Sequence, residues 1–185
     1  TAADGTPRFL GVGGKDGTYY ALDPRTGRLR WHTNVVFGGF SGGFIATASF
    51  DGRHVVGSTA LGDFGRFEGN GATYCQPGDP RDQPMQEPTV HAFDAASGRV
   101  LWEQDGAASF GPTTVAGGLT FNGPALRKTL QVRDAATGAL VIELPLDVPS
   151  WSGIATVGDA IVFGTGTSYQ AAPDGVVAYT PDGVA

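Results

Sequence analysis

The sequence predicts an all-β fold made of repeated antiparallel sheets. Thirty glycines and 12 prolines punctuate the 185 residues, a composition typical of many short strands joined by tight turns. A nine-residue pattern also recurs along the chain. Long periodic helical stretches are missing, as is any apolar run long enough to span a bilayer. The length suffices for one domain, residues 1–185, with a substantial core.

The recurring pattern is an Asp, a Ser or Thr followed by Gly, and a final Trp. Residues 23–31 (DPRTGRLRW) are matched by residues 94–102 (DAASGRVLW) and by residues 134–142 (DAATGALVI), where Ile replaces Trp. A degenerate fourth copy lies near residues 178–183, with spacing one residue shorter. The Asp accepts hydrogen bonds from the turn, and the Gly adopts positive φ. We therefore expect a hairpin between the two outer strands of each sheet, with the Trp wedged against the neighbouring sheet.

A second repeated pattern predicts the inner two strands. Residues 42–58, 110–123 and 151–166 each begin with small residues and continue into an apolar strand, a tight turn and a second alternating strand. The turns are Asp51-Gly52, Gly117-Gly118 and Gly158-Asp159, all of them types that close hairpins.

The spacing of the repeats indicates a β-propeller of four-stranded antiparallel blades. Repeats of about 40 to 50 residues with several strands each are typical of that architecture. The first two copies lie further apart, and the surplus is assigned to a loop insertion within one blade, residues 62–88. The chain opens on a middle strand, residues 8–14, and supplies about three to four blades of a ring of about seven or eight. A second polypeptide or a missing N-terminal half is therefore expected to complete the propeller.

Charge and residue content exclude several classes of function. The net charge is −6 without a basic stripe, so a nucleic-acid partner is not expected. The three histidines have no spacing typical of a metal pair, and residues 11–17 (GVGGKDG) fit neither a dinucleotide fingerprint nor a P-loop. The single cysteine, Cys75, is either a loop thiol or a bridge to another chain. The low Lys content and the absence of clustered Cys indicate an exported protein, periplasmic or extracellular, and a start at Thr1 fits a processed mature protein or a fragment.

The repeats resemble those of pyrroloquinoline-quinone (PQQ) type propellers, the quinoprotein alcohol dehydrogenases. Residues 16–31 (DGTYYALDPRTGRLRW) and 91–105 (HAFDAASGRVLWEQD) carry the resemblance, which is nearest to the polyvinyl-alcohol dehydrogenase-like branch. It covers nearly the whole chain except the insertion, and it implies that the chain is the C-terminal half. It also implies PQQ and calcium as cofactors, with Lys15 contacting the quinone oxygens and stabilising negative charge as hydride arrives. A solvent-facing turn lysine is the alternative reading of Lys15.

Other residues depart from the family pattern. Ile45 and Ala46 stand where the dehydrogenases have a polar residue and a Trp beside the cofactor, and the haem motif of the polyvinyl-alcohol branch is absent. Phe110 and Trp151 enter inner strands at equivalent positions, where they either plug the central channel or line a ligand site. Two hypotheses follow: an exported PQQ-dependent alcohol dehydrogenase, which the overall resemblance favours slightly, or a catalytically silent propeller that binds a protein partner.

Overall fold

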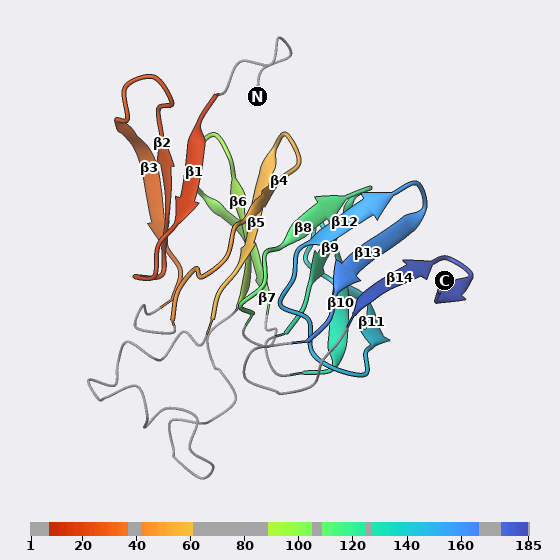
Figure 1. Ribbon diagram of the computed structural model, residues 1–185. Coiled ribbons are helices and arrows are strands. Elements are labelled where there is room, and N and C mark those ends of the chain that lie inside the picture. Colours follow the sequence, from red (N-terminus) through yellow and green to blue (C-terminus); the bar gives the residue numbers. More distant parts are fainter. Residues whose placement is uncertain are drawn as a thin grey trace, which may run out of the picture.

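The computed structural model describes residues 8–36, 42–60, 89–104, 109–124, 127–166 and 175–184. These residues form four antiparallel sheets that succeed one another along the chain, from β1–β3 to β12–β15 (Figure 1). In every sheet the strands follow each other in sequence order, so each sheet is a meander joined by hairpins. The all-β fold of four-stranded antiparallel blades that the repeats predict is confirmed.

The first two sheets are designated blades 1 and 2. Blade 1 consists of β1 (Leu10–Gly13), β2 (Thr18–Leu22) and β3 (Leu29–Asn34). Blade 2 consists of β4 (Ser49–Phe50), β5 (His54–Ser58), β6 (Val90–Asp94) and β7 (Val100–Gln104). The described part of blade 1 thus begins on a middle strand, as expected from the sequence.

The last two sheets are blades 3 and 4. Blade 3 consists of β8 (Thr114–Ala116), β9 (Leu119–Asn122), β10 (Thr129–Asp134) and β11 (Leu140–Pro145). Blade 4 consists of β12 (Ile154–Val157), β13 (Ala160–Gly164), β14 (Val176–Thr180) and β15 (Gly183–Val184). The insertion predicted at residues 62–88, Cys75 included, falls between β5 and β6 and lies outside the described residues.

The Asp motif forms the predicted outer hairpin in blades 1, 2 and 3. In blade 2, Asp94 Oδ1 accepts hydrogen bonds from the backbone of Ala96 (3.1 Å) and Ser97 (2.9 Å) and from the Ser97 hydroxyl (2.8 Å). Gly98 has a φ of 75° and donates its N–H to the Asp94 carbonyl at 2.8 Å. The same bonds recur around Asp23 and Asp134. The motif is thus a local structure that these few residues determine by themselves.

The core lies between successive blades. Tyr19 of blade 1, Phe44, and Val55 and Phe93 of blade 2 form one cluster, in which Tyr19 stacks on Phe93 with ring centroids 5.5 Å apart. Between blades 3 and 4, Phe121, Leu130 and Val132 pack against Ile154 and Phe163. Each blade therefore shields the apolar face of its neighbour.

Candidate functional site

The residues singled out in the sequence all lie on connections at one end of the blades. Lys15 is in the turn from β1 to β2, and Ile45 and Ala46 lie on the segment that enters β4. Phe110 and Trp151 precede β8 and β12. The Asp-motif turns described above lie at the opposite end of the same strands, so the structural turns and the candidate site occupy different ends of the blades.

The turn that carries Lys15 is held by its backbone. Gly14 donates to the Thr18 carbonyl at 2.8 Å, and its own carbonyl accepts from Gly17 at 3.1 Å and from Phe44 at 3.0 Å. A Cβ placed on Gly43 would lie only 2.7 Å from the Lys15 carbonyl oxygen, so the next blade's entry segment touches this turn. Lys15 is exposed, so its ammonium group lies on a rigid turn at the end of blade 1 opposite the Asp-motif turn. This end of the blades is called the loop end.

The segment beside this turn has its aromatic ring in the core. Phe44 is buried and meets Tyr19 edge to face, with ring centroids 5.5 Å apart. Ile45, which follows, is 40% exposed, and Ala46 is half-buried. A flat quinone needs an aromatic stacking partner and polar groups at its rim. Ile45 and Ala46 stand where the dehydrogenases have those groups, and they do not fit that requirement, since they offer an aliphatic and a methyl side chain.

Phe110 and Trp151 form an aromatic pair across blades 3 and 4. Their rings meet edge to face with centroids 4.9 Å apart, and both are half-buried. A Cβ on Gly111 would lie 3.1 Å from the Trp151 carbonyl, so the two entry segments are in close contact. Counted back from the inner turn, both rings occupy the position that Phe44 has in blade 2. Whether they plug a central channel or line a ligand site, the two roles that the sequence suggested, stays a prediction.

Two serines beside this pair were not found by sequence reasoning. Ser109 Oγ donates to the Gly123 carbonyl, and Ser150 Oγ donates to the Gly164 carbonyl, each at 2.7 Å. Each bond ties the start of a blade to the far end of that blade's second strand. The sequence shows these serines as a repeated pair, Ser followed by an aromatic residue (SF at 109–110 and SW at 150–151). Each serine hydrogen bond holds the backbone next to one of the two rings.

His91 is a buried histidine with both ring nitrogens hydrogen-bonded. It is fully buried, with Nδ1 2.9 Å from Glu103 Oε1 and Nε2 3.1 Å from Thr59 Oγ1. Because an ionised carboxylate only accepts, Nδ1 donates to Glu103 and Nε2 accepts from Thr59. Burial lowers the pKa of His91, although Glu103 opposes the shift. Within the described ranges, no group of three or more His, Cys, Asp or Glu side chains is placed to hold a metal ion.

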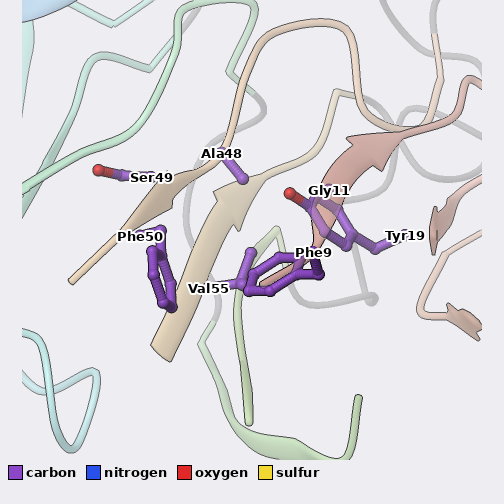
Figure 2. Close-up of a pocket in the computed structure, with 7 residues that line it drawn as sticks. All are labelled: Phe9, Gly11, Tyr19, Ala48, Ser49, Phe50 and Val55. Carbon is purple, nitrogen blue, oxygen red and sulfur yellow. The ribbon is translucent and has the colours of Figure 1, made fainter. Parts of the chain in front are cut away.

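A cavity of about 250 Å³ opens between blades 1 and 2 (Figure 2). Seven residues line it, none of them charged: Phe9, Gly11, Tyr19, Ala48, Ser49, Phe50 and Val55. Figure 2 shows the rings of Phe9 and Phe50 on its border. Lys15 is not among the lining residues, so this apolar space is separate from the predicted quinone contact. In the part of the chain that the structure describes, no helix is long and apolar enough to cross a membrane.

Comparison with known proteins supports the propeller architecture. A PQQ-repeat family model described as "Outer membrane protein assembly factor BamB" matches residues 15–184. No curated protein sequence matched the chain.

Several solved structures share the fold at low sequence identity. BamB from Moraxella catarrhalis aligns with a TM-score of 0.53 and 17% identity, covering 94% of this chain and 55% of that one. The computationally designed proteins Ika8 and Ika4 each align with a TM-score of 0.61 and 17% identity over 95% of this chain. The alignment covers 43% of Ika8 and 86% of Ika4. The chain thus spans about half the length of BamB and less than half that of Ika8.

Proposed function

The chain belongs to the PQQ-repeat family whose model is described as outer membrane protein assembly factor BamB, and from this premise we propose that it is a non-catalytic propeller scaffold. In this proposal the scaffold holds a protein partner at the loop end of its blades. The family description names an assembly factor for outer membrane proteins rather than an oxidoreductase. It also favours an exported location, which the sequence composition suggested.

The observation that carries the proposal is the chemistry beside Lys15. Phe44 is committed to the core, and Ile45 and Ala46 present neither an aromatic ring nor a polar group. An exposed Ile on the segment beside that turn is a good contact for another protein and a poor one for a polar, flat cofactor.

The partner would contact the aromatic pair on blades 3 and 4. Phe110 and Trp151 are half-buried, so part of each side chain is exposed to solvent at the same end of the blades as Ile45. Aromatic side chains are enriched at protein interfaces because they bury much area for little lost side-chain entropy. Since each ring braces the other, both are held ready for contact.

The same proposal includes a second propeller part. The described residues of blade 1 contain three strands, while blades 2 to 4 each contain four. These sheets thus include three four-stranded blades, whereas a closed propeller ring typically has about four to eight. Either another polypeptide or a longer form of this one would complete it.

The second candidate is a PQQ-dependent alcohol dehydrogenase of the polyvinyl-alcohol type, which the placement of Lys15 favours. When bound, PQQ accepts a hydride from an alcohol, with calcium beside it in the related enzymes. Lys15, on its rigid turn, would hold a quinone oxygen and stabilise negative charge there. The polar and stacking groups for that site would have to come from residues other than Ile45 and Ala46.

A crosslinking experiment in the native host tests the scaffold. A photoreactive phenylalanine analogue replaces Phe110 in the complete protein, with Val157, exposed next to the inner turn of blade 4, as the matched control position. We expect one discrete protein adduct from position 110, and an adduct reduced about tenfold or more by Trp151→Ala, as for an interface anchor. Adducts no stronger than those from position 157 would contradict the scaffold.

A cofactor titration separates the two candidates. PQQ with calcium is added to the complete protein while tryptophan fluorescence is followed, and dye-linked oxidation of alcohols is measured in parallel. We expect no saturable quenching and no oxidation. Saturable binding that Lys15→Ala removes would replace the scaffold with the dehydrogenase.

A further inference from the structure

The blades are joined by one repeated contact, first between blades 1 and 2. Trp31 on β3 donates its indole N–H to the Ala95 carbonyl of the blade 2 turn at 3.0 Å. Thr33 Oγ1 donates to the Gly98 carbonyl at 2.7 Å. A Cβ on Gly98 would lie 2.4 Å from Trp31 Cε3, so the ring covers a glycine that must lack a side chain.

The contact recurs between blades 2 and 3. Trp102 on β7 donates to the Ala135 carbonyl at 3.0 Å, and a Cβ on Gly138 would lie 2.5 Å from Trp102 Cε3. Ala95 and Ala135 both follow the motif Asp directly. Each Trp therefore contacts the same two features of the next turn: the carbonyl one residue after the Asp, and the Gly, which has no side chain.

The blade 1 turn has the same geometry but no Trp upon it. Gly27 has a φ of 69° and donates to the Asp23 carbonyl at 2.8 Å, as in the other two turns. Among the described residues, nothing lies within 4 Å of a Cβ placed on Gly27, and the residue is exposed, whereas Gly98 and Gly138 are buried. The equivalent carbonyl here belongs to Pro24.

The strands behind this turn are open in the same way. Leu10 is 57% exposed and Val12 49% exposed. By strand register, Leu10 corresponds to Val55 in blade 2 and Thr120 in blade 3, and Val12 corresponds to Asn122. These three residues, which lie on blades that follow another blade, are fully buried. The three described strands of blade 1 therefore present a blade-contact face in which apolar residues meet solvent.

A second copy of this chain does not supply the matching Trp. The sequence contains 3 Trp. Trp31 and Trp102 already cover Gly98 and Gly138, and Trp151 precedes an inner strand and pairs with Phe110. A Trp that covered Gly27 would therefore have to belong to residues outside this sequence.

We propose that the outer face of blade 1 binds the outermost strand of a further PQQ-type blade that lies outside these 185 residues. That strand carries a Trp eight positions after its motif Asp, whose ring covers Gly27 and whose indole N–H donates to the Pro24 carbonyl. Leu10 and Val12 pack against the inner strands of the same blade. This inference rests on the proposed completion of the ring and names the residue that completes it.

Site-specific crosslinking in the native host identifies the occupant. The photoreactive analogue is placed at Arg25, two residues after the Asp of the open turn. Ala136, two residues after Asp134, is the matched position in a turn whose Trp is known, and should form an internal adduct with β7. We expect Arg25 to give an adduct with a peptide containing Asp-x-x-Ser/Thr-Gly-x-x-x-Trp from outside the sequence. An adduct with a second copy of this chain, an adduct lacking that motif, or none beside a positive Ala136 control overturns the proposal.

A pair of glycine variants tests the Trp contact without depending on crosslinking. Asn tolerates positive φ better than other side chains, so Gly27→Asn and Gly98→Asn differ mainly in what meets the new Cβ. In the 185-residue chain, Gly98→Asn should lower the urea midpoint and Gly27→Asn should leave it unchanged. In the complete propeller, Gly27→Asn should lower the midpoint as Gly98→Asn does. An unchanged midpoint there would show that nothing covers Gly27.

The outcomes separate this inference from the scaffold function. If the Arg25 adduct carries the motif while position 110 gives no partner, the docking face stands and the scaffold fails. If position 110 gives a partner while Arg25 marks a second copy, the scaffold stands and the docking inference fails.

Discussion

Trp31 and Gly98 belong to different blades, yet the indole ring lies where a side chain on Gly98 would be. The glycine therefore has two requirements: its φ of 75° closes the turn, and its missing side chain makes room for the ring. The motif of blade 2 thus takes part in two contacts between blades. Its Asp–Gly turn receives Trp31 of the preceding blade, and its own Trp102 packs on the turn of the following blade.

We expect Trp102→Ala to be among the most destabilising single changes in the chain. Trp102 is 8% exposed and donates to Ala135, so its removal leaves a large cavity and an unpaired carbonyl between blades 2 and 3. A loss of about 3 to 5 kcal/mol in the free energy of unfolding is expected, measured by urea denaturation with linear extrapolation. Ile142→Ala, at the equivalent position of blade 3, is the control. Ile142 is 48% exposed, and its variant should lose less than about 1 kcal/mol; equal losses would contradict the role assigned to the Trp.

Stability should fall in acid because of the three motif carboxylates. Backbone donation from Thr26 and the Arg30 guanidinium lower the pKa of Asp23 from 3.8 to about 2. Hydrogen bonds from Ser97 and from Thr137 lower the pKa of Asp94 and of Asp134. A lowered folded-state pKa means that the unfolded chain takes up protons first as pH falls, so the stabilisation is complete above about pH 4 and is lost toward pH 2.

The test is the urea midpoint of the wild-type chain from pH 6 to pH 2. Replacing all three Asp by Asn keeps an acceptor oxygen in each turn and removes the titration. The triple variant should show a flatter profile over that range. A profile as steep as that of the wild type would assign the acid sensitivity to other carboxylates.

The sequence predicted the blades well because the outer hairpin is a local structure. In each turn the Asp side chain bonds to residues two and three positions onward, and Asp23 also bonds Arg30, seven positions onward. The turn itself requires only a positive φ of the Gly that follows. A motif with such short range can be read from spacing alone. The inner hairpins are similarly local, since each turns on a Gly-containing pair.

Features that depend on neighbouring blades could not be predicted in the same way. The burial of His91 requires Thr59, which is 32 positions away, and its ring contacts with Phe44 and Phe93. Ile142 replaces the Trp of the motif and is 48% exposed. The turn that follows in blade 4 has only two residues between β14 and β15, fewer than the motif turns of the other blades. The site was placed on Lys15 by resemblance, whereas the burial of Phe44 depends on packing between two blades. Function follows from such contacts more than from the repeats.

Phe44→Ala should lower the free energy of unfolding much more than Phe110→Ala. The two rings occupy equivalent positions, but Phe44 is buried against Tyr19, while Phe110 meets Trp151 and solvent. We expect Phe44→Ala to cost about 3 to 5 kcal/mol of unfolding free energy and Phe110→Ala less than about 1.5 kcal/mol. Urea denaturation of both variants measures the difference. If Phe110→Ala proved as costly as Phe44→Ala, Phe110 would be a core residue and not a free contact surface.

His91→Gln should remove a pH dependence near neutrality. Burial lowers the pKa of His91 below its ordinary value of 6.5, so the unfolded chain protonates first as pH falls through that value, and the wild type loses stability from about pH 7 downward. Gln131 shows that glutamine fits this place, because it occupies the same register position in blade 3 and donates to Glu143 at 2.7 Å. The variant should be stable to within about 1.5 kcal/mol of the wild type at pH 7.5 and should keep that stability to pH 5.5. His32→Gln makes the same change on an exposed strand position and is the control. A His91→Gln profile that still declines between pH 7 and pH 5.5 would show that another group is responsible for the decline.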